Sequence, residues 1–152
     1  IAEAINKRGL SASKFFFPKY GSLAKYDPKD TANTINDMDF VRWVVTQFAS
    51  VEEVIEAIKK IKIVHIFIDE NGVPSPTAHW RVSDKGGRSV VIEIVHEGEV
   101  QIHENTAKVL TNSPGYNWHV TNLNNYINLH PGTSSPQMIN DVEATSFGVG
   151  SS

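Results

Sequence analysis

The sequence predicts an α+β fold in which two consecutive helices precede an antiparallel β-meander. Three patterns carry this prediction. Apolar residues recur at helical spacing between residues 36 and 61, short β-rich runs follow from residue 78, and Gly-containing turns separate those runs. A length of 152 residues suits a single domain with a sizeable core.

The chain first indicates a buried strand and then a long loop. Residues 9–18, GLSASKFFFP, gather apolar and aromatic side chains ahead of a proline, which is typical of a strand followed by a turn. Residues 19–34 are polar and interrupted by Gly and Pro, so they predict a surface loop. Loops of this length are uncommon without a functional or assembly role, and we expect this one at a contact or at the rim of a pocket.

Two helices joined at Ser50 come next. In residues 36–49, apolar side chains recur at helical spacing, and Asn36 or Asp37 can cap the first turn. Ser50 and Glu53 have the spacing of a capping box for the second helix. The two helices therefore form a corner. The apolar stripe of the second helix consists of Val51, Val54, Ile55, Ile58 and Ile61.

The second half predicts strands and turns in quick succession. Residues 62–68 are expected to be extended, and residues 69–77 to form a loop. A Lys-Gly-Gly turn between two β-rich runs predicts a hairpin. A short helix is expected over residues 117–129, with Asn117 as its cap. The expected strands are residues 78–84, 88–95, 100–105 and 107–113.

The composition excludes several classes of function. A net charge of -3 without any Lys/Arg-rich run argues against nucleic-acid binding. No apolar segment approaches the roughly 20 residues that span a bilayer. With no cysteine, these residues contain no disulfide, thiolate metal ligand or Cys nucleophile. Since the chain starts without Met and ends in a Gly/Ser-rich stretch, we expect it to be the interior of a longer protein.

The histidines do not predict a metal site. They stand singly, without the HxH or HExxH spacing of known metal ligands, and no cysteine accompanies them. Solvated or locally hydrogen-bonded histidines explain the pattern better, and a serine nucleophile has no GxSxG elbow. The six are His65, His79, His96, His103, His119 and His130.

The stretch TNSPGYNW is the remaining candidate for chemistry. Pro114 disfavours helix at Ser113, so it would hold the Asn112 amide in one orientation at the end of the expected strand. A neutral amide donor fixed in this way is the group that stabilises an oxyanion in acyl transfer. The same residues also suit a plain turn, and on physical grounds alone the turn is favoured.

Four collinear segments resemble the choloylglycine hydrolase family, which comprises bile salt hydrolases and penicillin V acylases. The resemblance extends from about Ile5 to Ser152 without large gaps, and its most specific parts are TNSP with NLNNY and the HW segment. The segments are NKRGLSASKFFFP (6–18), SVEEVIEAIKKIKIV (50–64), AHWRVSDKGGRSVVIE (78–93) and VLTNSPGYNWHVTNLNNYINL (109–129).

The resemblance implies an N-terminal nucleophile hydrolase with an αββα sandwich, in which residues 1–152 form one incomplete domain. Members cleave linear, non-peptide amides such as conjugated bile salts or penicillin V, using an N-terminal cysteine as nucleophile and its α-amino group as base. That cysteine and the assisting arginines and aspartate have no counterpart here, so we expect the chain alone to be inactive. The resemblance further implies a small-molecule acyl-amide substrate, no cofactor and a homotetramer, and leaves the compartment open between cytoplasm and periplasm.

The resemblance also implies roles for particular residues. The Asn of the TNS motif, Asn112, supplies the side-chain donor of the oxyanion hole. The position two residues before the Pro of the early strand is often Asn or Tyr in the family; here it is Phe16, whose backbone N–H remains a possible second donor. An apolar Phe wall and the loop before HW would hold the acyl group, although the same phenylalanines could simply pack into the sandwich. The substrate-binding candidates are Phe15, Ile68, Val73 and Ala78.

Two alternatives remain open at this point. The chain could be a non-catalytic domain of the same fold with an assembly or ligand-binding role, because it has no cysteine and none of the charged catalytic partners. It could also be an unrelated β-rich binding module in which TNSPGYNW is a surface loop. The collinear order of the four segments argues against this second alternative.

Overall fold

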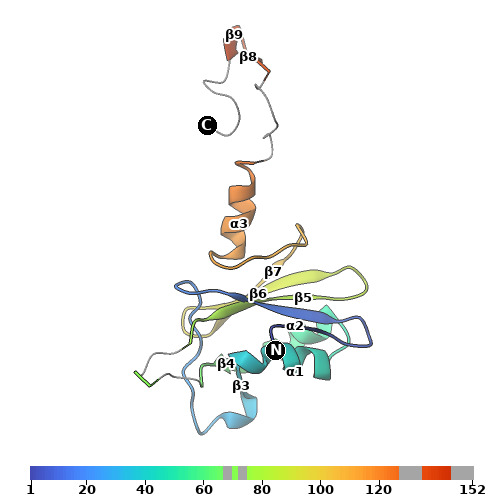
Figure 1. The fold of residues 1–152 in the computed structure, drawn as a ribbon, viewed down its shortest axis with the longest axis vertical. Coiled ribbons are helices and arrows are strands. Elements are labelled where there is room, and N and C mark those ends of the chain that lie inside the picture. Colours follow the sequence, from blue (N-terminus) through green and yellow to red (C-terminus); the bar gives the residue numbers. More distant parts are fainter. Residues whose placement is uncertain (67–69, 72–74, 127–134, 145–152) are drawn as a thin grey trace. The chain divides into compact units, whose positions relative to one another are not determined.

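The computed structural model describes residues 1–66, 70–71, 75–126 and 135–144 (Figure 1). The chain divides into two compact units, Ile1–Tyr116 and Asn117–Ser152. The first unit contains every predicted site residue that the structure describes. Among the described residues, no helix is both long and apolar enough to cross a membrane.

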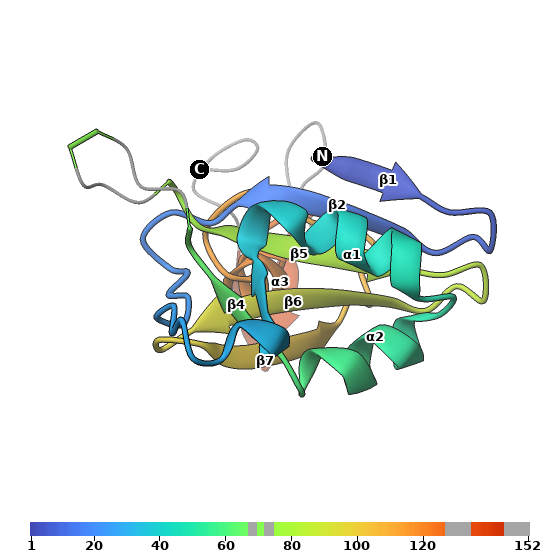
Figure 2. The same ribbon diagram turned by 90° about the horizontal axis from the view of Figure 1, so that it is seen from below.

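The first unit contains an antiparallel sheet of five strands in the order β1-β2-β5-β6-β7 (Figure 2). The predicted early strand, the hairpin and the strand after it are all confirmed. The hairpin register pairs Trp80 with Ile92 and Ser83 with Ser89. The strands are β1 (Glu3–Ile5), β2 (Ser11–Phe16), β5 (Ala78–Ser83), β6 (Ser89–Val95) and β7 (Glu99–Glu104).

The predicted helix pair covers one face of this sheet as α1 (Phe40–Gln47) and α2 (Val51–Ile58) (Figure 2). The Ser50 hydroxyl accepts the Glu53 N–H at 3.3 Å, as the capping box predicts. The Glu53 carboxylate reaches back to the Ala49 N–H, one residue before the cap. At the other helix, Asn36 caps the short 3₁₀ helix η2 (Asp37–Asp39) that leads into α1.

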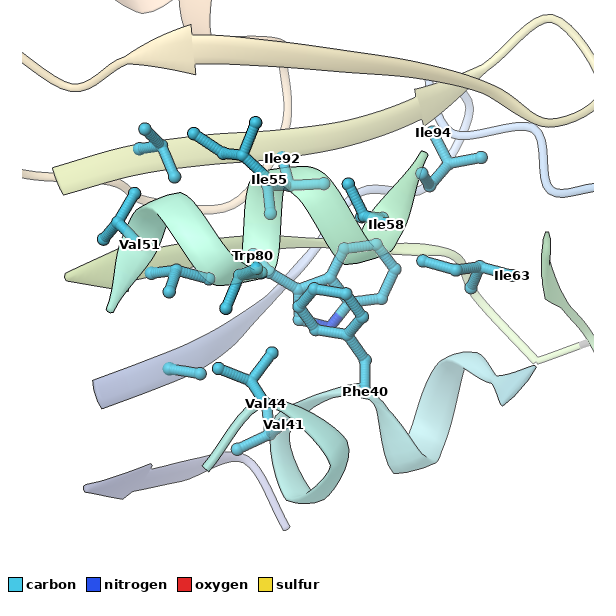
Figure 3. Packing of buried hydrophobic residues seen from close by; sticks show 14 of the residues in the cluster. Phe40, Val41, Val44, Val51, Ile55, Ile58, Ile63, Trp80, Ile92 and Ile94 are labelled. Carbon is cyan, nitrogen blue, oxygen red and sulfur yellow. The ribbon is translucent and has the colours of Figure 1, made fainter. Parts of the chain in front are cut away.

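The hydrophobic core lies between the helix pair and the sheet (Figure 3). Phe40 packs on Trp80 with ring centroids 4.5 Å apart, and both side chains are fully buried. Because side chains alternate along a strand, the neighbours of Trp80 and Ile92 point to the opposite face of the sheet. That second face therefore carries His79 and Glu93. The core also contains Val41, Val44, Val51, Val54, Ile58, Val82, Val90 and Ile94.

The long loop over residues 19–34 is attached to the rest of the unit near its middle. The Ala24 N–H donates to the Ile63 carbonyl at 3.1 Å, and Ala24 forms a parallel bridge with Val64. After the 3₁₀ helix η1 (Thr31–Asn33), strand β3 (Thr34–Asn36) pairs in parallel with β4 (Lys62–Val64). Within the predicted extended run 62–68, residues 62–64 form this strand, and residues 67–69 lie outside the described residues.

The predicted strand over residues 107–113 is wrong. The chain turns first, since the Lys108 N–H donates to the Asn105 carbonyl and Lys108 adopts a φ of 60°. Of the apolar pair that suggested a strand, Val109 is 66% exposed. Where the segment reaches β2, the Asn112 side chain accepts the Phe16 N–H and the Ser113 N–H donates to the Phe16 carbonyl. An irregular loop results.

The described part of the helix predicted over residues 117–129 forms α3 (Tyr116–Leu123), and residues 127–129 lie outside the described residues. The prediction that Asn117 caps the helix is wrong. The helix starts one residue earlier, and the Tyr116 N–H donates to the Glu93 carboxylate at 2.8 Å. A carboxylate from β6 therefore satisfies the first N–H of the helix, which a sequence-local cap would otherwise do. The second unit continues with an antiparallel hairpin of β8 (Gln137–Ile139) and β9 (Val142–Ala144).

Candidate active site

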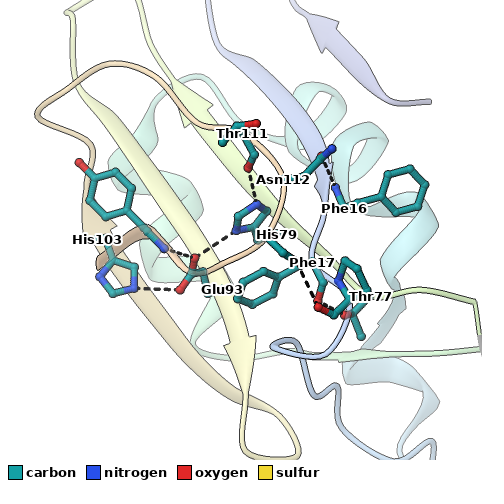
Figure 4. A network of polar contacts seen from close by, with 11 residues as sticks. Phe16, Phe17, Thr77, His79, Glu93, His103, Thr111 and Asn112 are labelled. Atoms are coloured by element: carbon teal, nitrogen blue, oxygen red, sulfur yellow. Dashed lines mark hydrogen bonds and ion pairs between the residues drawn. The ribbon is translucent and has the colours of Figure 1, made fainter. Parts of the chain in front are cut away.

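Asn112 is anchored at the end of β2 (Figure 4). Its Oδ1 accepts the Phe16 N–H at 2.9 Å, and the next residue, Ser113, donates its N–H to the Phe16 carbonyl at 2.8 Å. The Lys14 N–H donates to the carbonyl of Ala2, the residue before β1. Because backbone groups alternate in direction along a strand, the N–H of Phe16, two residues further, points to the same side of β2. The Asn112–Ser113 pair thus bonds to the edge of β2 beyond the start of β1, which runs antiparallel to β2.

This contact fixes which way the Asn112 amide faces. A backbone N–H can only donate, so the atom of the amide that faces Phe16 has to be the oxygen. The Nδ2 donor of Asn112 is consequently directed away from Phe16. Ser113 adds a hydrogen bond from its hydroxyl to the Pro18 carbonyl at 3.1 Å, which ties the same loop to the chain after β2.

Phe16 has a different arrangement from the one expected of a backbone oxyanion donor. In this structure its N–H donates to Asn112, so it orients the neighbouring amide. Its side chain is 60% exposed. The backbone of Phe16 and the side chain of Asn112 are therefore hydrogen-bonded to each other, with the Phe16 N–H occupied by Asn112 Oδ1.

A cavity of about 450 Å³ adjoins this assembly. It brings together three of the predicted residues, Phe15, Phe16 and Ala78, and its lining is mainly apolar. The Ser75 hydroxyl is buried without a hydrogen-bond partner among the described residues. Ile68 and Val73, the other two predicted substrate contacts, lie outside the described residues. The remaining lining residues are Ala2, Lys14, Met38 and Pro76.

A buried polar cluster that the sequence did not predict lies on the second face of the sheet (Figure 4). We call His79, Glu93, His103 and Tyr116 the Glu93 cluster. His79 is fully buried, with Nδ1 3.1 Å from Glu93 Oε1 and Nε2 2.8 Å from the carbonyl oxygen of Thr111. His103 Nε2 lies 3.4 Å from Glu93 Oε2. The cluster thus contacts Thr111, which is the residue directly before Asn112.

The Glu93 carboxyl is ionised in this cluster. Burial by itself raises the pKa of Glu93, but the contacts from His103 and His79 and the Tyr116 N–H outweigh it and lower the pKa to about 2. Strand alternation could have located the group. Glu93 is the one acid in the apolar run VVIEIV, and His79 occupies the position before the core residue Trp80.

The lowered pKa of Glu93 predicts a loss of stability in acid. The folded-state pKa lies below the ordinary value of 4.5, so the contribution is present above that value and is lost as the pH falls towards 2. We expect Glu93→Gln to lower the free energy of unfolding at pH 7 by on the order of 2–3 kcal/mol, and by less at pH 3. Urea titrations of both proteins at the two pH values measure this difference.

Asp37 provides a control of the opposite sign. Burial raises the pKa of its carboxyl, and His65 and Lys14 oppose this only in part. A raised pKa means that ionisation destabilises the fold as the pH rises. Asp37→Asn removes this ionisation. The free energy of unfolding of the variant, relative to wild type, should therefore be higher at pH 7 than at pH 3. Equal pH dependence in the Glu93 and Asp37 variants would contradict at least one of the two assignments.

Among the residues that the structure describes, no three His, Cys, Asp or Glu side chains gather in a way that could hold a metal ion. The chemistry available to this part of the chain consists of an oriented amide, an apolar cavity and a buried contact between His79 and Glu93. These parts can stabilise and position a substrate carbonyl, but they contain no nucleophile.

Comparison with known proteins defines the family. Residues 1–152 match the sequence model of the linear amide C-N hydrolases, choloylglycine hydrolase family. The chain belongs to this family. A bile salt hydrolase/transferase from Clostridium perfringens is 40% identical to it over 150 residues, which cover 99% of this chain and 45% of that relative. The chain thus spans less than half the length of this relative.

Solved structures of the family have the same fold. A variant of the conjugated bile acid hydrolase from Clostridium perfringens superimposes with a TM-score of 0.75 at 39% identity, covering 99% of this chain and 45% of that one. A penicillin V acylase from Agrobacterium tumefaciens gives a TM-score of 0.69 at 24% identity, covering 87% of this chain and 40% of that one, which supports the fold alone. The predicted α+β fold and choloylglycine hydrolase resemblance are confirmed, and an unrelated β-rich binding module is excluded.

Proposed function

We propose that the full-length protein containing this chain hydrolyses a linear, non-peptide amide, either a conjugated bile salt or an acyl amide such as penicillin V. The observation that carries the proposal is the Asn112 amide, fixed by the Phe16 N–H at the end of β2 beside an apolar cavity. Family membership supports the reaction class, and the name of the Clostridium perfringens relative supports bile salts as one substrate class.

In this proposal, Asn112 stabilises the charge that develops on the substrate carbonyl. The nucleophile, by the family resemblance an N-terminal cysteine outside these residues, forms a C–S bond while the carbonyl oxygen becomes an oxyanion. Nδ2 of Asn112 donates to that oxygen. Because the Phe16 N–H already holds Oδ1, the amide needs no reorientation during the reaction. The C–N bond then breaks, the thiol proton leaves with the amine through the α-amino group, and water hydrolyses the thioester.

The cavity lined by Phe15, Phe16 and Ala78 would receive the acyl part of the substrate, with Ile68 and Val73 as further contacts proposed from the sequence. Its apolar lining suits a steroid or an aromatic acyl group, whereas the leaving amine needs a more polar surrounding.

We also propose a homo-oligomer, by resemblance to the family. Light scattering of the full-length protein measures its mass in solution, and a monomer would contradict this part of the proposal.

Removing the Phe16 side chain should weaken binding of the acyl group. Phe16→Ala keeps the backbone N–H that orients Asn112 but takes a large apolar surface from the cavity wall. We expect KM to rise about fivefold, corresponding to roughly 1 kcal/mol of lost apolar contact, with kcat changed less than KM. Phe16→Leu, which restores most of the apolar surface, should recover most of the KM. A change in kcat alone would place Phe16 outside the acyl pocket.

A substrate panel tests the proposed reaction directly. Glycocholate, taurocholate, penicillin V and an acyl-homoserine lactone are incubated with the full-length protein, and the released amine or lactone product is measured. Hydrolysis of at least one conjugated bile salt or of penicillin V is the expected result. Inactivity on all four would overturn the proposal.

The alternative is a non-catalytic domain of the same fold with an assembly or ligand-binding role. The absence of cysteine from all 152 residues is the observation that favours it. The sequence of the full-length protein separates the two functions. A cysteine that becomes the first residue after processing would reject the non-catalytic alternative, and a mature chain without one would support it.

A further inference from the structure

His79 holds the peptide group that precedes Asn112. Its Nε2 lies 2.8 Å from the carbonyl oxygen of Thr111, and that carbonyl belongs to the peptide bond between Thr111 and Asn112. Asn112 is therefore held at both ends, with its side-chain oxygen on β2 and its preceding peptide group on β5. His79 itself is fixed, because it is fully buried and its ring stacks on Phe17 at 4.4 Å and 9°.

The contacts of His79 require a doubly protonated ring. Nε2 faces a carbonyl oxygen, which can only accept a hydrogen bond. Nδ1 faces Glu93 Oε1, and the same oxygen already accepts the Tyr116 N–H at 2.8 Å. Both partners are acceptors, so both ring nitrogens have to donate. A neutral imidazole has a single N–H and would leave one of these buried contacts without its proton.

Glu93 supplies the charge that keeps this imidazolium buried. An ion without a counter-ion in a fully buried position is strongly disfavoured, and Glu93 is the carboxylate that His79 contacts. The groups that face the pair come from three elements. His103 comes from strand β7, and Tyr116 is the first residue of α3. The uncharged rings of Phe15 and Phe17 come from β2 and the residue that follows it.

We propose that His79 and Glu93 are positioning residues for Asn112, acting as a buried imidazolium–carboxylate pair that fixes the Thr111–Asn112 peptide group. The inference rests on the proposed function, because it takes Asn112 as the oxyanion donor. It adds a second anchor to the one from Phe16. Displacement of a reacting or stabilising group by about 1 Å can cost roughly 10²-fold in rate, so such an anchor has a measurable effect.

Two variants of the full-length protein test the pair. His79→Phe keeps a ring to stack on Phe17 but removes the donor to Thr111, and it should lower kcat about 10–100-fold with KM within about threefold. Glu93→Gln keeps the shape and an acceptor for the Tyr116 N–H, and it should lower kcat about tenfold at pH 8. Glu56→Gln, an exposed carboxyl-to-amide change on α2, should leave kcat unchanged.

The split between kcat and KM separates positioning from a general loss of structure. If His79 and Glu93 position Asn112, both variants should lose kcat with KM within about threefold, whereas a disordered acyl pocket would raise KM as well.

A double-mutant cycle with Asn112→Ala tests whether the pair acts through Asn112. If it does, Glu93→Gln and His79→Phe should cost less than about twofold once Asn112 is gone. Equal losses in both backgrounds would overturn the inference. Should His79→Phe fail to fold by circular dichroism, Glu93→Gln alone decides. If Asn112→Ala leaves kcat unchanged, the proposed role of Asn112 as oxyanion donor is wrong. That outcome is distinguishable from equal losses in both backgrounds, which overturn only the role of the His79–Glu93 pair.

Discussion

Asn112→Ala in the full-length protein is expected to lower kcat by about 10²–10³, with KM within about threefold. The effect should appear in kcat because the Nδ2 donor contacts charge that exists only as the carbonyl oxygen becomes an oxyanion. The Phe16 N–H, 2.9 Å from Oδ1, holds the amide ready for that contact before substrate arrives. Steady-state hydrolysis of glycocholate or penicillin V measures both constants. An unchanged kcat would remove Asn112 from the oxyanion hole.

Asn112→Asp separates the anchor from the donor. A carboxylate oxygen still accepts the Phe16 N–H, so the loop stays attached to β2. The second oxygen, in place of Nδ2, carries negative charge and would repel the developing oxyanion. We therefore expect a loss of kcat at least as large as in Asn112→Ala. Asn124→Ala, at an exposed asparagine after α3, is the matched control and should leave kcat unchanged.

Local patterns in the sequence were sufficient for the helix pair and the hairpin. The Ser50 cap, the apolar stripe after it and the turn between β5 and β6 depend on neighbours within a few residues, so spacing alone predicts them. The same reasoning failed for residues 107–113. Whether an apolar run pairs as a strand depends on a partner edge, and here the loop meets β2 through the side chain of Asn112.

The site was predictable only in part for the same reason. Asn112 stands in a recognisable motif, and Phe16 was placed beside it by the family resemblance. The contacts of Thr111 with His79 and of Tyr116 with Glu93 join residues 32 and 23 positions apart. No short-range pattern contains them. Asn117 has a residue type and a spacing that suit a local cap. In the structure, however, the carboxylate of Glu93 accepts the N–H of Tyr116, the first residue of the helix.

Glu93→Leu is expected to lower the free energy of unfolding of the full-length protein by about 3–5 kcal/mol at pH 7. The change leaves the buried imidazolium of His79 without a counter-ion and the Tyr116 N–H without its acceptor. It also replaces a polar side chain by an apolar one of similar size, so the loss comes from the unpaired partners and not from a cavity. The shift of the urea midpoint at constant slope measures it.

The double variant His79→Leu/Glu93→Leu identifies the origin of that loss. Removing both ions leaves no uncompensated charge, and replacing a buried pair by apolar residues of similar volume is often neutral or stabilising. The double variant should therefore be more stable than Glu93→Leu alone, although the Tyr116 N–H and the Thr111 carbonyl remain without their partners. If it regains stability but not kcat, the pair contributes to the position of Asn112 and little to the net stability of the fold. A double variant less stable than Glu93→Leu would show instead that an imidazolium without its counter-ion is not the origin of the loss.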